Sequence, residues 1–302
     1  MEKSYRKTGF LLALVILIAA ASNAYASDDI STQVDIPYET FQLDNGLTVL
    51  VHSDHSIPTV FVGMWYAVGS KDEPAGKTGF AHLFEHLMFQ GTESREGEYF
   101  APFTDAGATG MNGTTSQDRT NYYATVPSGA LDMALWMESD RMSNLLGAVT
   151  QEALDEQRDV VKNEKRQGET RPYAKMGDKI REGLYPVGHP YRHSVIGSMD
   201  DLDAASLEDV HEWFNTYYGA SNVVLVLAGD VTLEDAKTRV EHYFGGVPTG
   251  VPLSYPKKWV PELTENREEA MYDRVGVTRI SRVWALPGLN DRDTSLMYLV
   301  ND

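Results

Sequence analysis

Apolar and polar residues alternate in two short runs near the start of the chain, at 41–43 and 47–52, on either side of Asn45-Gly46. A repeat of two residues is typical of a strand with one buried face, and Asn-Gly between two such runs favours a tight hairpin turn. Runs rich in β-branched and aromatic residues predict further strands at 59–68, 120–126, 222–228 and 276–285. The chain should therefore contain a sheet that begins with a hairpin.

Segments with a helical repeat lie between these strands. Apolar residues recur every three to four positions at 78–90, 129–146, 150–169, 200–218 and 232–244. Strands and helices mixed in this way predict an α+β fold of layered sheets covered by helices. A last helix should begin at Asp293-Thr294.

The helix at 78–90 carries the most specific chemical pattern, His-x-x-Glu-His, formed by His82, Glu85 and His86. Residues four apart on a helix share a face, so the two imidazoles can bind one zinc ion. The carboxylate of Glu85 can then reach a water on that metal, an arrangement found in zinc peptidases. Thr78 is placed to cap the start of this helix, and Gly91 to end it in the left-handed conformation.

The broad apolar surface of this helix predicts that it is buried, and its histidines and glutamate then need polar partners. A metal ion would supply one; the alternative is that they are core histidines bonded to backbone groups. A catalytic zinc also needs a third protein ligand, and the best source is the charged helix at 150–169, for which Thr150 can be the N-cap. Spacing alone does not choose among its candidates, Glu152, Glu156, Glu164 and Glu169.

Together these segments resemble the insulinase/pitrilysin family of zinc peptidases, which includes the mitochondrial processing peptidases and bacterial homologues. Residues 82–86, His-Leu-Phe-Glu-His, match the inverted motif of the family, and 158–164, Arg-Asp-Val-Val-Lys-Asn-Glu, match its downstream segment. Residues 110–123 and the loop at 189–197 are similar to the segments beside the family's site. The resemblance runs from about residue 38 to the end of the chain.

This resemblance implies that Glu164 is the third ligand beside the two histidines, with one zinc ion per chain, and that Glu85 is the catalytic base. It also implies that the strand near 112–120 lines the site, with Asn112 and Thr115 as candidate substrate-binding residues. An extended peptide substrate could pair with that strand by β-augmentation.

Two features depart from the family pattern. Members often carry a helper glutamate two turns before the third ligand, where this chain has Gln157 with Glu156 beside it. Active members use two homologous halves that close around the substrate, and only the first half is recognisable here. We therefore interpret the chain as a fragment or as a subunit that needs a homologous partner, with two related subdomains, a zinc-binding one at 27–200 and a shortened one at 201–302.

The first 26 residues have the form of a secretory signal peptide. Basic residues precede an apolar run at 10–21, and Ala24-Tyr25-Ala26 is a small-x-small cleavage pattern. The run is too short to span a bilayer comfortably, so we expect cleavage after Ala26 and a periplasmic or secreted protein with no stable membrane anchor. The chain has no cysteine, which excludes disulfide bonds and a cysteine-linked lipid anchor.

A net charge of −18 argues against nucleic-acid binding, because phosphate contacts need clustered lysine and arginine. The sequence thus predicts an exported zinc endopeptidase that hydrolyses peptides or small unfolded proteins. The alternatives are an inactive or partner-dependent subunit of a two-part peptidase of the same fold, and a protein with a structural metal site. The complete motif with Glu85 favours catalysis, because a structural site has no use for a general base.

Overall fold

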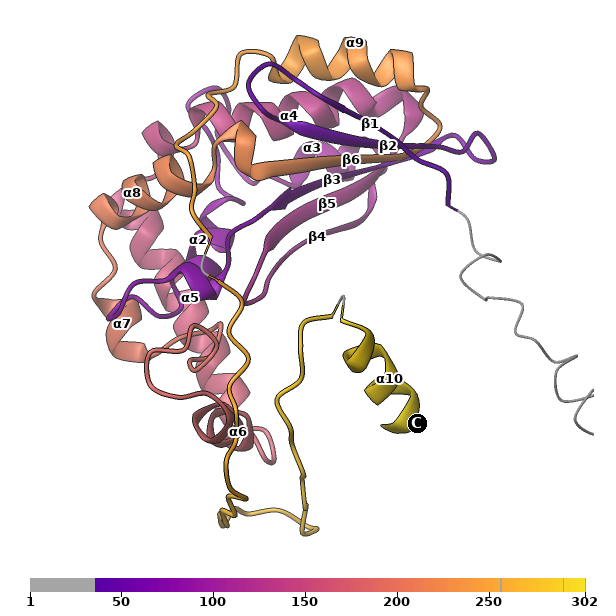
Figure 1. Cartoon of the computed structure of the whole chain (residues 1–302). Coiled ribbons are helices and arrows are strands. Elements are labelled where there is room, and N and C mark those ends of the chain that lie inside the picture. The colour runs from indigo at the N-terminus through magenta and orange to yellow at the C-terminus, as the bar shows by residue number, and fades with distance from the viewer. Residues whose placement is uncertain (1–35, 256, 290, 302) are drawn as a thin grey trace, which may run out of the picture. The chain divides into compact units, whose positions relative to one another are not determined.

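A six-stranded sheet organises the part of the chain that the structure describes (Figure 1). The structure is a computed structural model that describes residues 36–301 except 256 and 290. The strand order is β1-β2-β6-β3-β5-β4, and neighbouring strands are antiparallel except β2 and β6, which are parallel. The strands are β1 (Glu39–Gln42), β2 (Thr48–Ser53), β3 (Thr59–Tyr66), β4 (Thr109–Thr115), β5 (Thr120–Pro127) and β6 (Val223–Gly229). The expected α+β fold and the hairpin between β1 and β2 are both confirmed.

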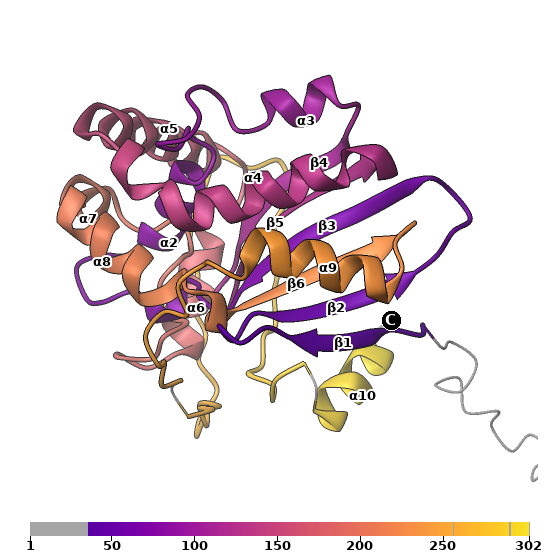
Figure 2. The same ribbon diagram turned by 90° about the horizontal axis from the view of Figure 1, so that it is seen from above.

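One face of the sheet is buried under two helices, α4 and α9 (Figure 2). Alternate residues of β3 point to this side, and Val60, Met64 and Tyr66 have no solvent exposure, as a strand with one buried face requires. The core therefore lies between the sheet and these helices. The helices are α2 (Phe80–Leu87), α3 (Ala101–Asp105), α4 (Leu131–Asn144), α5 (Gln151–Glu169), α6 (Met176–Leu184), α7 (Met199–Asp203), α8 (Leu207–Tyr217), α9 (Leu233–Phe244) and α10 (Arg292–Asn301).

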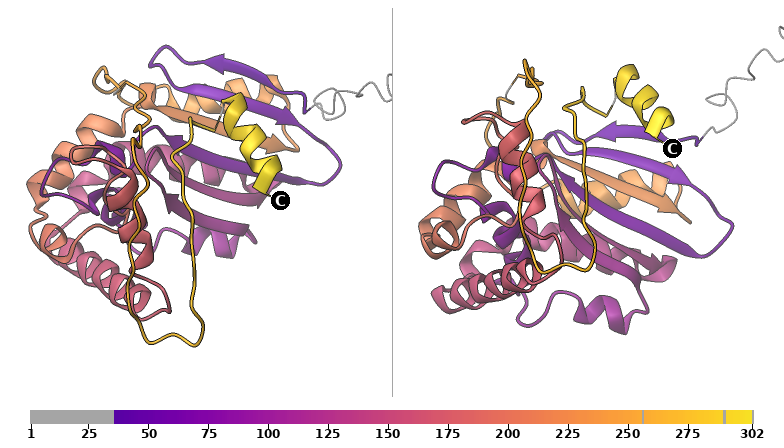
Figure 3. Two further views of the ribbon diagram at one scale, coloured as in Figure 1. Left: turned by 60° about the horizontal axis from the view of Figure 1, so that its bottom comes forward. Right: turned by 90° about the horizontal axis from the view of Figure 1, so that it is seen from below.

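The opposite face of the sheet, with α4 and α9 behind it in Figure 3, is only partly covered. Phe61 stacks on Tyr123 with ring centroids 5.9 Å apart, and Trp65 is 38% exposed. Gly63 lies between the two β3 aromatics, where a Cβ atom would come within 2.7 Å of the Phe61 ring. The two faces of the sheet thus differ, one forming the core and the other presenting aromatic side chains.

The central strand β6 comes from beyond the boundary expected near residue 200. It pairs with β2 on one side and β3 on the other, and Glu39–Asp302 forms one compact unit. Residues on both sides of position 200 thus contribute strands to one sheet, and the division into two related subdomains stays a prediction. Strand order depends on contacts between residues far apart in sequence, which the local hydrophobic pattern does not specify.

Two expected elements differ from the structure. The segment 276–285 forms no strand, and its Val277 and Ile280 are 72% and 87% exposed; a strand needs neighbouring strands or packing to be stable. The helix expected at 200–218 is two helices, α7 and α8, because Ser206 accepts a hydrogen bond from the Asp209 amide and starts α8 anew.

The expected signal peptide and its cleavage site after Ala26 lie outside the described residues. Within the described residues, none of the helices has the length and apolar character needed to cross a membrane.

Candidate metal centre

The helix with the histidine motif, α2, begins at Phe80 with Gly79 as its N-cap. The sequence pattern predicted Thr78 as the N-cap. That prediction is wrong, because the Thr78 hydroxyl donates to the carboxylate of Asp201 instead. Gly79 has a φ of 92°, and a Cβ atom there would lie 2.6 Å from the Ile196 carbonyl oxygen. Glycine is therefore needed at position 79 for both conformation and space.

The end of α2 also differs from expectation. Met88 is its C-cap, in the right-handed helical conformation, and Gly91 is not among the described glycines with a positive φ. The left-handed termination expected at Gly91 is therefore wrong.

The contact between α2 and α5 brings the three expected ligands together. The Nε2 atoms of His82 and His86 each lie 3.7 Å from Oε2 of Glu164, and the three ligand atoms are all within 4.8 Å of one another. Around a tetrahedral zinc ion with bonds of about 2.1 Å, ligand atoms are about 3.4 Å apart. The side chains thus lie near the spacing that a zinc ion requires.

Of the four candidate glutamates on α5, Glu164 is the one that lies beside both histidines. Within the described residues, His82, His86 and Glu164 are the one group of three histidine or carboxylate side chains placed to hold a metal. Gln157 hydrogen-bonds the His86 side chain, whereas Glu156 is exposed. An amide therefore contacts the second histidine where the family pattern has a helper glutamate.

Both histidines lie in an environment that favours their neutral form. Burial, aided by the nearby His86, lowers the pKa of His82 to about 4. Burial also lowers the pKa of His86, while Glu164 and Gln157 oppose this change. Neutral imidazole is the form that binds metals, so the pair suits a metal without further proton loss at neutral pH.

Glu85 is 7% exposed and faces β4. Burial raises its pKa to about 6; Glu164 adds to the rise, while the Thr115 hydrogen bond and Arg119 oppose it. The Thr115 hydroxyl donates to Glu85 Oε2 at 2.5 Å. A carboxyl group with a pKa near neutrality can both accept and return a proton, as a general base must.

Close contact between β4 and α2 depends on Gly113. A Cβ atom at this position would lie 2.6 Å from the Phe89 ring and 3.3 Å from Oε1 of Glu85. Asn112, the other candidate substrate residue, is exposed and alternates with Thr115 to the opposite side of the strand. The structure therefore places Thr115 at Glu85 but does not bring Asn112 to it.

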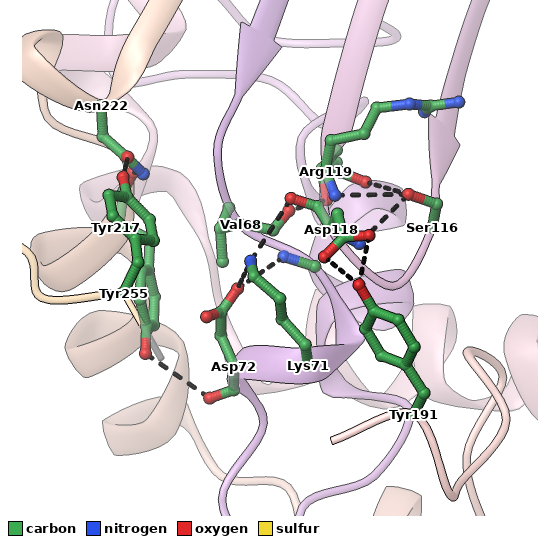
Figure 4. Close-up of polar contacts among 12 residues, drawn as sticks. Val68, Lys71, Asp72, Ser116, Asp118, Arg119, Tyr191, Tyr217, Asn222 and Tyr255 are labelled. Atoms are coloured by element: carbon green, nitrogen blue, oxygen red, sulfur yellow. Dashed lines mark hydrogen bonds and ion pairs between the residues drawn. The ribbon is translucent and has the colours of Figure 1, made fainter. Parts of the chain in front are cut away.

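The turn that joins β4 to β5 is anchored by residues from two distant segments (Figure 4). The Tyr191 hydroxyl donates to both carboxylate oxygens of Asp118 at 2.6 Å. The backbone amides of Ser70 and Lys71 donate to carbonyl oxygens of the same turn at 3.1 and 3.0 Å. These bonds hold the end of β4, and with it Thr115, in a fixed position.

Sequence reasoning had not identified the role of Arg119, which donates to the Thr114 carbonyl oxygen at 3.0 Å and to the Asn121 side chain. Its guanidinium group also lies 5.3 Å from the centre of the Trp65 ring. The only hint in the sequence was that Arg119 lies within residues 110–123, which resemble a segment beside the family's site. The pairing register of β4 and β5 decides these contacts.

Family models match most of the chain. Residues 48–188 match the model described as insulinase (peptidase family M16), and residues 204–302 match the one described as peptidase M16 inactive domain. An uncharacterised zinc protease of Mycobacterium leprae is 30% identical over 80% of this chain and 56% of its own length.

Solved structures of proteases have the same fold. A protease from Helicobacter pylori aligns with a TM-score of 0.69 and 27% identity, over 74% of this chain and 53% of that one. The first half of the periplasmic protease PqqL from Escherichia coli aligns with a TM-score of 0.66 and 22% identity, over 74% of this chain and 50% of that one. The chain thus spans about half the length of the relatives that it matches.

Proposed function

Because the chain belongs to the insulinase family, peptidase family M16, we propose that it is the zinc-binding part of an exported endopeptidase. The observation that supports this most directly is the grouping of His82, His86 and Glu164 on two packed helices, with Glu85 beside His86. We infer one zinc ion per chain, held by these three residues.

The donor set fits zinc and leaves a coordination position open. Two histidines and one carboxylate are the protein ligands of several catalytic zinc sites. Bound zinc acts as a Lewis acid that makes water nucleophilic near neutral pH and polarises a carbonyl group. The carboxylate of Glu85 takes a proton from the attacking water as the new C–O bond forms, and returns it to the leaving amine as the C–N bond breaks.

An extended peptide is the substrate that best suits the site. β4 is an edge strand of the sheet within the described residues, so its outer backbone groups can pair with a further strand. The same strand carries Thr115, which contacts Glu85. A peptide added to β4 would therefore run past the catalytic carboxylate, and the exposed Asn112 on the other side of β4 is a second candidate contact for that peptide.

The complete enzyme is proposed to need a homologous second half and to act outside the cytoplasm. The half-length match supports the first part of this proposal. The signal-like residues 1–26 support the second, as does the similarity in fold to the periplasmic protease PqqL. The alternative, an inactive subunit of a two-part peptidase of the same fold, leaves the proposed base Glu85 without a use.

The experiment that tests the proposal is Glu85→Gln, measured for both zinc content and peptide turnover. The amide keeps the size of the side chain but cannot accept the proton, so turnover should fall by about 10²–10⁴-fold while zinc remains bound. Turnover is measured with a quenched peptide on the longer protein or on the chain with its second half. Near-normal turnover by the zinc-loaded variant would show that Glu85 is not the base.

A further inference from the structure

The first turn of α2 is held by a buried carboxyl group that has no part in the proposed chemistry. Oε2 of Glu73 accepts a hydrogen bond from the Gly79 amide at 3.0 Å, and its Oε1 accepts one from Ala81 at 2.8 Å. The first amides of a helix lack partners within it, and Gly79 has no side chain with which to cap them. The fully buried Glu73 side chain therefore caps the N-terminus of α2 from outside the helix.

A second carboxylate holds the residue just before the helix. Oδ2 of Asp201 accepts from the Thr78 amide at 2.9 Å and also from its hydroxyl. The amide of Ser198 donates to the same hydroxyl at 3.1 Å. Gly197 packs so closely here that a Cβ atom on it would lie 2.1 Å from the Thr78 carbonyl oxygen. The start of α2 is thus fixed against the segment that contains α7.

The segment containing α7 is bonded in turn to α5, the helix that carries Glu164. Arg158 of α5 donates to the carbonyl oxygens of Leu202 and Ala205 at 2.9 and 2.7 Å. Lys162 of the same helix donates to Asp203 at 2.5 Å. The short helix α7 therefore links the helix of the two histidines to the helix of the glutamate.

His82 depends on this support more than His86 does. His82 is the third residue of α2, within the turn that Glu73 holds. Its Nδ1 atom is buried without a hydrogen-bond partner in the described part of the chain, whereas His86 is hydrogen-bonded by Gln157. Metal-binding histidines are usually oriented through their second ring nitrogen. For His82, the helix backbone and packing must supply that orientation.

We propose that Glu73 and Asp201 are positioning residues that fix α2 relative to α5 and so determine how tightly the three ligands bind zinc. This inference rests on the proposed metal site. It assigns to the two acidic side chains an effect on metal affinity, beyond any effect on the stability of the fold.

The test compares zinc affinity in Glu73→Gln and Asp201→Ala with that of the unchanged chain, by competition with a chromophoric chelator. The glutamine oxygen can accept one of the two amide bonds but its nitrogen cannot accept the other. Alanine at 201 leaves the Thr78 amide without its acceptor. We expect zinc to bind about 10–100-fold more weakly in each variant, and the visible absorption of bound cobalt(II) to change in shape or intensity.

Matched controls separate positioning from folding. Glu208→Gln removes an exposed acid from the first turn of α8, and Asp132→Ala removes one from the first turn of α4. Both controls should bind zinc and cobalt as the unchanged chain does, and circular dichroism measures the folded fraction of every variant.

The inference fails if both variants bind zinc as tightly as the controls with an unchanged cobalt spectrum. It also fails if the whole loss of affinity equals the fraction that has unfolded. An unchanged chain that binds no zinc would instead overturn the proposed function, and this inference with it.

Discussion

Three glutamates near α2 differ in their surroundings, and these differences suit them to separate tasks. Glu164 is the most exposed of them, with 43% of its side chain open to solvent beside the two histidines. Burial raises the pKa of Glu85 to about 6 and that of Glu73 to about 8. The sequence pattern alone distinguished Glu85 by its place in the motif but did not distinguish Glu73 from a surface acid.

The titration of Glu73 should make the metal-free protein less stable as pH rises. Desolvation raises its pKa from 4.5 to about 8, with Asp201 and Asp72 adding to the rise and the bonds from Ala81 and Gly79 opposing it. The folded state therefore binds this proton more tightly than the unfolded state does. The free energy of unfolding should fall between pH 4.5 and 8, by at most about 1.4 kcal/mol per pH unit.

Urea unfolding of the metal-free chain and of Glu73→Gln across pH 5–8 tests this contribution, because the glutamine side chain does not titrate. His193, whose Nδ1 atom lies 3.5 Å from Oε2 of Glu73, is present in both proteins. As pH rises, the free energy of unfolding of the unchanged chain should fall relative to that of Glu73→Gln. A difference that stays constant over this range would show that Glu73 does not titrate there.

At the scale of elements, local signals predicted the parts that local chemistry determines. Thr150 caps α5 and accepts the Ala153 amide, as its position suggested, and the Asn45-Gly46 turn lies between β1 and β2. The insertion of β6 between β2 and β3 was not predicted, and neither was the contact of Asp201 with Thr78. Both join residues more than 100 positions apart, and no periodic pattern reports such pairings.

Gly113→Ala should destabilise the protein by about 1–3 kcal/mol, because the added methyl group overlaps the Phe89 ring and crowds Tyr122. The matched control is Gly129→Ala, where a Cβ atom would meet nothing within 4 Å and φ is not positive. Thermal unfolding of the three proteins measures the effect. Equal stability of both variants would mean that β4 does not approach α2 as closely as the structure shows.

At the scale of the whole molecule, the proposed metal ligands and the proposed base all come from α2 and α5, within Phe80–Leu87 and Gln151–Glu169. The chain nevertheless spans about half of the relatives that it matches. All residues of the proposed metal site therefore belong to this chain. The proposed substrate chamber needs a homologous second half in addition.

We expect the chain alone to bind zinc but to cleave peptides slowly, and a homologous second half to raise turnover by orders of magnitude. Holding a substrate in a reactive geometry can lower a barrier by about 7–11 kcal/mol, so losing part of that positioning outweighs an intact zinc site. The measurement is turnover of a quenched peptide with and without the second half. Rapid cleavage by a chain shown by sizing to be monomeric at assay concentration would contradict this expectation.

The most direct test of the metal centre is zinc per chain, measured by elemental analysis after extensive dialysis. The unchanged chain and Glu85→Gln should each retain one zinc ion, because Glu85 is not proposed as a ligand. His82→Ala, His86→Ala and Glu164→Gln should each lose most of it, because each removes one of three protein ligands. Zinc content that is unchanged in these three ligand variants, or absent from the unchanged chain, would contradict the assignment of the site.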